Sequence, residues 1–195
     1  MHLHGTTHTY SGNVDNTPAT DEILTIQLKN GDIHAGSVLY TRHKQAVYSF
    51  CLRMLRDPAS AQDAAQETFL KMISKIHSVQ QGTTLKSWLF SVARNEVLMV
   101  LRRNKIVPME PLDDEMEAYD PATPLSVSMD SELREKISNA IAQLKPAYRE
   151  AYLLRETEGM SYEEIASVTG TTVSAVKTKL FKSRVALHDM LKPYL

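Results

Sequence analysis

Hydrophobic residues recur every three or four positions on both sides of a proline-rich segment, and this pattern limits the possible folds more than any other feature. Before the segment they are Ala61, Ala65, Phe69, Met72, Ile73 and Ile76, and after it Leu133, Ile137, Ile141 and Leu144. That spacing places apolar side chains on one face of a helix, whereas a half-buried strand alternates at every second position. The sequence shows no strand-like alternation and therefore predicts an all-α protein.

The proline-rich segment divides the chain into two small helical domains. Residues 106–129 contain four prolines and six acidic residues with no Lys or Arg, which is typical of a flexible linker. Residues 1–20 are polar and lack periodicity, so we expect a disordered tail. The predicted organisation is a tail at 1–20, a helical domain at 21–105, an acidic linker at 106–129 and a second helical domain at 130–195.

Helix-breaking residues set the expected helix boundaries of the first domain. Gly31 and the Asp57-Pro58 pair separate helices at about 21–30 and 32–56, because the residue before proline is pushed out of helical geometry. A third helix should begin near Ser60, with Asp63 resembling a capping box. A fourth should follow residue 84.

Charge is distributed in blocks that a net charge of −1 conceals. Residues 39–107 carry eleven basic and four acidic residues, residues 108–129 are purely acidic, and residues 130–195 are close to neutral. Such blocks suggest a polyanionic partner and a tether that avoids it. One cysteine, Cys51, within an apolar helix, suits packing in a reducing compartment. Without a long apolar segment or a signal-peptide pattern, we expect a cytoplasmic protein with no membrane insertion.

The clearest local motif lies near the C-terminus. Ser161 and Glu164 form a capping box that starts a short helix, and Gly170 suits the left-handed residue that ends it. Thr172 can cap a second helix that runs through Leu187. Two short helices joined by a tight glycine-containing turn predict a helix-turn-helix.

The second helix of this motif is basic over most of its length. Ser174, Ala175 and Lys177 near its start would face base edges in a major groove. The later cations, Lys179, Lys182 and Arg184, would meet phosphates. The alternative is a solvated basic helix in an ordinary bundle, and many regulators also carry a helix-turn-helix.

Two patterns in the first domain suggest binding surfaces. Asp63, Gln66, Glu67 and Leu70 share one stripe away from the apolar face, although spacing alone favours a solvated face. The helix after residue 84 carries polar and basic side chains outward, with Trp88 and Phe90 nearby. Cations and aromatic rings together suit single-stranded DNA. The alternative is that Trp88 and Phe90 are core residues of a helix with a basic end, and for Trp88 the two interpretations are equally supported. The outward-facing side chains are Ser87, Ser91, Arg94, Asn95 and Arg102.

These segments together resemble a known family. Residues 38–105 resemble region 2 of the extracytoplasmic-function RNA polymerase sigma factors. The resemblance rests on Val47-Tyr48, residues 52–58, residues 63–70, residues 88–95 and Leu101-Arg102-Arg103. Residues 130–191 are similar to region 4, through residues 144–149 and 176–180. The short connector leaves no room for a region 3 domain, which marks this minimal class.

The resemblance implies a function and partners. Such a protein binds core RNA polymerase, recognises the −35 and −10 promoter elements, promotes DNA opening and is usually silenced by an anti-sigma factor. It is not an enzyme and needs no cofactor or metal. Core contacts would fall on the β′ clamp helices, through Asp63, Gln66, Glu67 and Leu70, and region 4 would also contact the β flap. The −10 element would be bound by Lys86, Ser87, Trp88, Arg94, Asn95, Arg102 and Arg103. The −35 element would be bound by Ser174, Ala175, Lys177, Lys179, Lys182 and Arg184.

Three positions depart from the family pattern. The family commonly has an acid where Met99 stands, and often has Thr and Arg where Ala175 and Lys179 stand. Lys179 lacks the bidentate fork of arginine, so it suits a phosphate better than a guanine. The −35 preference therefore stays open.

Two other function classes remain as alternatives. A DNA-binding regulator would bind its operator without polymerase, whereas a sigma factor needs core polymerase for tight promoter binding. An enzyme is disfavoured, because the histidines are scattered and no phosphate-binding loop or nucleophile elbow is present in the sequence.

Overall fold

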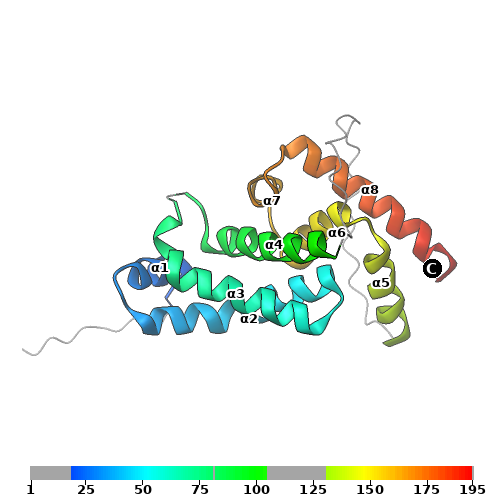
Figure 1. The fold of residues 1–195 in the computed structure, drawn as a ribbon. Helices are drawn as coiled ribbons and strands as arrows, with labels where there is room; N and C mark the ends of the chain where they lie inside the picture. The colour runs from blue at the N-terminus through cyan, green and yellow to red at the C-terminus, as the bar shows by residue number, and fades with distance from the viewer. Residues whose placement is uncertain (1–18, 81, 105–130, 195) are drawn as a thin grey trace, which may run out of the picture.

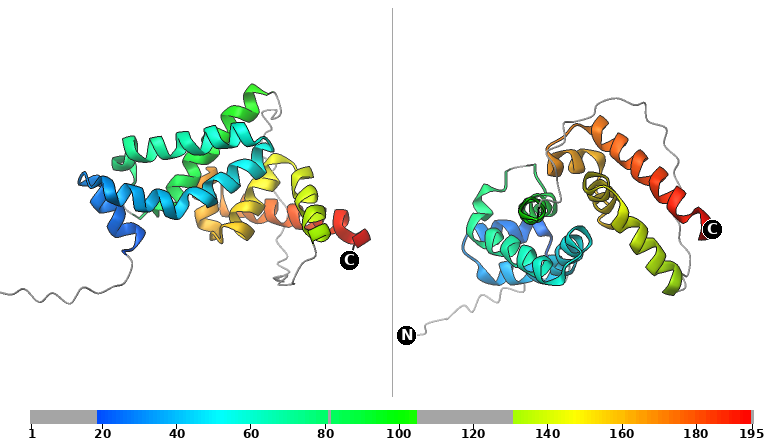
Figure 2. Two further views of the ribbon diagram at one scale, coloured as in Figure 1. Left: turned by 90° about the horizontal axis from the view of Figure 1, so that it is seen from below. Right: turned by 45° about the vertical axis from the view of Figure 1, so that its right-hand side comes forward.

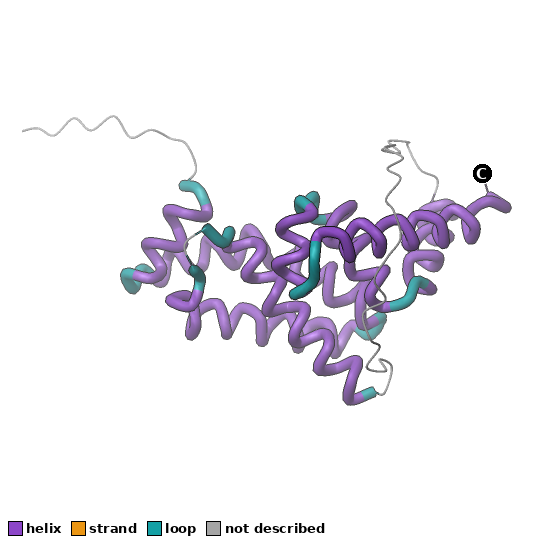
Figure 3. Tube along the Cα trace, turned by 90° about the horizontal axis from the view of Figure 1, so that it is seen from above, coloured by secondary structure: helices purple, strands orange, loops and turns teal. Residues whose placement is uncertain are grey.

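The computed structural model describes residues 19–80, 82–104 and 131–194, and the regular elements in these ranges are all helical (Figure 3). The all-α prediction is confirmed. The expected tail, up to residue 18, and the expected linker lie outside the described residues. No helix in the described ranges is long and apolar enough to cross a membrane. The α-helices are α1 (Asp21–Lys29), α2 (Ile33–Leu55), α3 (Pro58–Lys75), α4 (Leu85–Arg103), α5 (Ser131–Gln143), α6 (Pro146–Tyr152), α7 (Tyr162–Thr169) and α8 (Val173–Leu191).

Helices α1–α4 form the first domain, and local capping sets their ends. Arg56 adopts a left-handed conformation with φ of 60° and ends α2. Asp57 then caps α3 by accepting a hydrogen bond from the Ser60 backbone N–H at 2.9 Å, and Pro58 occupies the first turn. The expected capping box of Ser60 with Asp63 is therefore wrong, because Asp57 already caps this helix.

The core of the first domain lies between α2, α3 and α4. Phe50 and Phe90 are buried and meet edge to face, with ring centroids 5.4 Å apart. Phe90 is therefore a core residue. The close approach of α1 to α2 depends on Gly36, where a Cβ atom would lie 3.1 Å from Leu28 Cδ1 and 3.3 Å from Ile73 Cδ1. Ile73, which spacing assigns to the apolar face of α3, covers this glycine and is 54% exposed.

Helices α5–α8 form the second domain, and its predicted signals are confirmed. Ser161 and Glu164 make the reciprocal capping box of α7, and Gly170 ends that helix with φ of 65°. Thr172 caps α8 by accepting from the Ala175 N–H at 3.1 Å. Between α6 and α7, residues Leu153–Thr157 form a π-helical turn. Helices α7 and α8 are thus the helix-turn-helix expected from the sequence.

The two domains pack directly against each other (Figure 1, Figure 2). Helix α4 lies against α7, and the end of α2 lies against α6. One continuous cluster of buried apolar side chains includes Leu89 and Phe90 from α4 together with Ile165 and Ala166 from α7. The sequence predicted two domains held by a tether, and the structure adds an extensive contact between them.

Candidate docking and nucleic-acid interfaces

The predicted docking stripe lies on the solvent side of α3. Asp63, Gln66, Glu67 and Leu70 are all exposed, and Leu70 is 55% exposed despite being apolar. The opposite face of α3 is anchored in the core by buried apolar residues such as Phe69. The helix therefore presents this stripe without needing it for folding.

An apolar hollow of about 720 Å³ continues the stripe toward α2. Gln66 and Leu70 line it, together with Ile33, Tyr40 and Ile73. Ile33 is 78% exposed, and the Tyr40 ring meets Phe69 edge to face at 4.9 Å. Exposed apolar side chains grouped in this way are typical of a protein-binding surface.

The other half of the stripe borders a polar hollow between α3 and α4. Asp63 and Glu67 line it together with Met99 and Arg103. At its base, Lys71 Nζ lies 2.5 Å from a carboxylate oxygen of the buried Glu96 and 3.8 Å from Glu67. The predicted stripe therefore joins an apolar hollow on one side to a charged one on the other.

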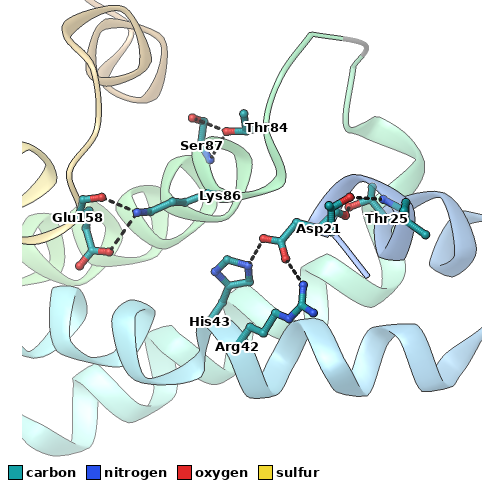
Figure 4. A network of polar contacts seen from close by, with 10 residues as sticks. Asp21, Thr25, Arg42, His43, Thr84, Lys86, Ser87 and Glu158 are labelled. Atoms are coloured by element: carbon teal, nitrogen blue, oxygen red, sulfur yellow. Dashed lines mark hydrogen bonds and ion pairs between the residues drawn. The ribbon is translucent and has the colours of Figure 1, made fainter. Parts of the chain in front are cut away.

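The first turn of α4 points at the second domain rather than at solvent. Thr84 caps the helix by accepting from the Ser87 N–H, and Ser87 is buried. The Ser87 hydroxyl donates to Glu164 in α7 at 3.4 Å. The Lys86 ammonium donates to the backbone carbonyl of Glu158 and lies 3.8 Å from the carboxylate of that residue (Figure 4). The expected outward position of Ser87 is therefore wrong in this arrangement.

Arg94, in the middle of α4, is also engaged across the domain contact. Its Nε donates to Glu150 of α6 at 2.6 Å, and the Glu150 side chain is 5% exposed. Burial raises the pKa of Glu150, while the charges of Arg94 and Lys179 oppose this rise. Burial lowers the pKa of Lys179, with Glu150 acting in the opposite sense. A residue predicted to bind the −10 element and one predicted to bind the −35 element thus face the same carboxylate.

The remaining predicted −10 residues are arranged differently. Asn95, Arg102 and Arg103 are exposed, and the two arginines lie in the last turn of α4. Trp88 is half-buried and packs against the core. The structure therefore divides the predicted −10 surface into an exposed part and a part that the second domain contacts.

Helix α8 presents the start of the predicted −35 surface. Ser174 and Lys177 are exposed, and the Lys177 ammonium lies 5.9 Å from the Tyr162 ring centroid. Ala175, Lys179 and Lys182 are half-buried, and Arg184 pairs with Glu156 at 3.0 Å. The exposed first turn of α8 can approach a groove, whereas Lys179 is held near the domain contact.

Several residues of the domain contact were missed in the sequence. Arg149 is 8% exposed and donates to backbone carbonyls of both domains, including Met54 at 3.1 Å. Glu150 accepts a hydrogen bond from Arg94, and Glu158 forms an ion pair with Lys86, as described above. No local pattern signals such pairs, because their members belong to different motifs more than fifty residues apart.

No metal or reactive-thiol site is found in the described part of the chain. Groups of His, Cys, Asp or Glu that could hold a metal ion are absent from residues 19–80, 82–104 and 131–194. The three histidines near the N-terminus, His2, His4 and His8, whose clustering could suggest a metal site, lie outside these ranges. Cys51 is buried, and burial raises the pKa of its thiol to about 12. It is therefore a packing residue at neutral pH.

Comparison with known proteins defines the class to which both domains belong. Residues 39–106 match the family model for sigma-70 region 2, and residues 134–187 match that for sigma-70 region 4. Among solved structures, CnrH in complex with the cytosolic domain of CnrY has a similar fold, with a TM-score of 0.67 at 21% identity over 89% of this chain and 97% of that one. The sigma factor RpoE of Bartonella quintana, crystallised with the anti-sigma factor NepR, gives a TM-score of 0.62 at 26% identity over 80% of this chain and 96% of that one.

Full-length relatives are named sigma factors. The RNA polymerase sigma factor CarQ of Myxococcus xanthus is 32% identical over 168 residues, covering 85% of this chain and 94% of that protein. The ECF RNA polymerase sigma-E factor of Escherichia coli is 27% identical over 185 residues, covering 90% and 96%. The chain therefore belongs to the RNA polymerase sigma factors of the extracytoplasmic-function class. It is a non-catalytic transcription initiation factor, and the expected family is confirmed.

Proposed function

We propose that this sigma factor engages core polymerase through α3 and promoter DNA through α4 and α8. The observation that carries this proposal is the exposed α3 stripe, which the fold leaves unburied although it contains Leu70. Helices α4 and α8 come from separate domains, so two promoter elements can be read by one chain once the domains are apart. We further propose that the factor acts in the cytoplasm, together with the polymerase.

Docking on the β′ clamp helices would use both sides of the stripe. Leu70 and the neighbouring apolar hollow would bury nonpolar surface, while Asp63 and Glu67 would pair with cations of the partner. Charge complementarity at the rim of such an interface mainly sets the association rate and the specificity. A cluster of exposed apolar residues at the centre supplies most of the affinity.

The DNA contacts would be divided between the two domains. Asn95, Arg102 and Arg103 are exposed on α4 and suit the opened −10 strand, where cations follow the backbone. Lys86, Ser87, Trp88 and Arg94 would complete this surface after the domains separate. Ser174, Ala175 and Lys177 would reach base edges of the −35 element, and the later cations Lys179, Lys182 and Arg184 would contact phosphates.

Control by an anti-sigma factor is a further part of the proposal. The structural relatives RpoE and CnrH were both solved in complexes, RpoE with an anti-sigma factor and CnrH with the cytosolic domain of CnrY. A partner of this kind would cover the same α3 and α4 surfaces that polymerase and DNA require. Competition between the two partners would then set the activity of the factor.

The test of polymerase docking is a charge reversal at Glu67. The substitution Glu67→Lys removes only an exposed 3.8 Å pair with Lys71, which contributes little to stability. We expect affinity for core polymerase to fall about tenfold or more, since a like charge is placed in a complementary interface. Binding is measured by titrating labelled factor with core enzyme, together with run-off transcription on a cognate promoter.

The matched control is Glu22→Lys, an equal charge reversal at an exposed position of α1. Circular dichroism of both variants establishes that they fold. Unchanged core affinity for Glu67→Lys would rule out docking through the α3 stripe. Tight, specific promoter binding by the factor without core polymerase would favour the alternative of a classical operator-binding regulator.

A further inference from the structure

Helix α1 is fixed to α2 by contacts along its length. At its start, Asp21 accepts from the Arg42 guanidinium at 2.9 Å and lies 2.5 Å from His43 Nε2 (Figure 4). Farther along, Leu28 is buried and packs over Gly36 of α2. Polar contacts near one end and apolar contacts near the other thus hold α1 on the core. A side chain in its last turn therefore projects from a rigid element.

The last turn of α1 is tied to a different part of the first domain. Lys29 is half-buried, and its ammonium donates to the backbone carbonyl of Val79 at 2.8 Å. Val79 is buried and directly follows the short turn Ile76–Ser78 at the end of α3. The two residues are 50 positions apart in the sequence. One side chain of α1 therefore fixes the point at which the chain leaves α3 on its way to α4.

The chain leads from this point into the first turn of α4. Gln80, next to Val79, is exposed, as is Thr84 at the other end of the connection. Thr84 caps α4 by accepting from the Ser87 N–H at 3.2 Å. The first turn of α4 carries residues proposed above to bind the −10 element. The bond from Lys29 and the cap of α4 are thus two anchors of a surface connection that runs into the proposed −10 surface.

Helix α1 does not need Lys29 for its own C-terminal end. The backbone N–H groups of Asn30, Gly31 and Asp32 donate to carbonyls of its last turn, at 3.0 Å each. Holding a long lysine side chain in one geometry costs conformational entropy. The charge-assisted hydrogen bond to the Val79 carbonyl offsets that cost. What the bond adds to the fold is therefore an ordered start to the connection between α3 and α4.

We propose that Lys29 is a positioning residue for opening of the −10 element, acting through the Val79 carbonyl on the connection between α3 and α4. The proposal rests on the assignment of α4 to the −10 element. A connection that is already ordered loses less conformational entropy when the opened strand binds beside it. Docking on core polymerase through α3 and −35 contacts through α8 do not depend on this bond. Helix α1 thereby takes part in promoter opening without contacting DNA.

The test removes the donor and then restores it. Lys29→Met keeps an unbranched apolar stem without the ammonium, and methionine is a good helix former, so the variant should fold. Lys29→Arg keeps a cation that can donate to the same carbonyl. The matched control is Lys75→Met, which removes an equal charge from an exposed residue in the last turn of α3. That control leaves the bond to Val79 in place.

Opening and binding are measured separately, with full-length factor and core polymerase. The template is a promoter recovered by run-off transcription from a promoter library. Permanganate reactivity of thymines near the start site reports opening, and titration of labelled factor gives core affinity. We expect opening by Lys29→Met to fall about fivefold to tenfold, because one charge-assisted hydrogen bond is lost. Opening by Lys29→Arg and Lys75→Met should stay within about twofold of the parent, and all core affinities should be unchanged.

Three results would overturn the positioning role. The first is equal opening by Lys29→Met and Lys75→Met. The second is an Lys29→Arg variant that opens as poorly as Lys29→Met, since the donor would then not be the cause. The third is a loss of core affinity or helical signal by Lys29→Met in parallel with opening, which would mean that Lys29 only supports the fold.

Failure of the proposed function has a different signature. If α4 does not bind the −10 element, replacing its exposed Asn95 by alanine leaves opening unchanged. If the chain does not direct polymerase to promoters, the parent itself gives no run-off product from the library. Reduced opening by Asn95→Ala together with normal opening by Lys29→Met would keep the function of α4 and remove only the role of Lys29.

Discussion

Replacing Arg149 by methionine should lower the free energy of unfolding by about 3–5 kcal/mol, because several buried carbonyl groups lose their hydrogen-bond donor. The guanidinium donates to the Ile141 carbonyl at 3.1 Å, the Leu144 carbonyl at 3.0 Å and the Met54 carbonyl at 3.1 Å, and also to that of Ala142. Ala142 and Met54 lie in the last turns of α5 and α2, where carbonyls lack helical partners. The Ile141 carbonyl also accepts from the Leu144 N–H at 3.2 Å. Each hydrogen bond from a charged donor contributes about 1.5–3 kcal/mol, and removing the buried charge offsets part of the sum.

The assay is urea denaturation followed by far-ultraviolet circular dichroism. Methionine keeps the unbranched apolar stem of arginine but lacks the guanidinium, so the loss reports the hydrogen bonds together with the small void that the guanidinium leaves. Arg149→Lys is the matched control, because lysine keeps the charge but carries its donors on one compact ammonium group that cannot reach all of these carbonyls at once. We expect it to lose about half as much stability as the methionine variant. A loss below about 1 kcal/mol for Arg149→Met would refute the reasoning, since it would mean that water satisfies those carbonyls.

Three further results are expected. Gly170→Ala should cost about 1–2 kcal/mol in urea denaturation, because φ is 65° there and alanine is strained in the left-handed region. The Cys51 thiol should react with a disulfide reagent at pH 8 only after unfolding. Its folded pKa of about 12 lies above the ordinary value of 9.0, so its contribution to the free energy of unfolding is present below pH 9 and is lost as the pH rises toward 12. Lys177→Ala should weaken −35 binding by about 1–3 kcal/mol in a sequence-dependent manner, whereas Lys182→Ala should weaken all sequences alike and reduce the salt slope, as titrations on two −35 sequences would show.

The helix-turn-helix could be predicted because its signals are local. A capping box needs Ser161 and Glu164 three residues apart, and the turn needs a residue such as Gly170 that tolerates positive φ. Each signal depends on a few neighbouring positions, so the sequence contains all of the information. The solvent-facing position of Leu70 could be predicted for the same reason, from its place on a polar stripe opposite the apolar face.

The third helix shows where local reasoning chose the wrong residue. Asp57 and Ser60 are both good capping residues, and Pro58 is favoured in the first turn of a helix. The structure uses Asp57, which gains a hydrogen bond to the Ser60 N–H at 2.9 Å. Ile73 fits the apolar face by spacing, but it packs over Gly36 at the rim of the core. Its exposure depends on how closely α1 and α2 approach, which spacing within one helix does not specify.

The contact between the domains could not be read from composition for a further reason. The net charge of the second domain is close to zero, which conceals the uneven placement of its acidic and basic side chains. Glu150, Glu158 and Glu164 face α4, while Lys177 is exposed on α8. The second domain therefore presents carboxylates to the basic block of the first domain, residues 39–107, and cations to solvent. A sequence can predict that the basic block attracts a polyanion, but only the fold places acids of the same chain against it.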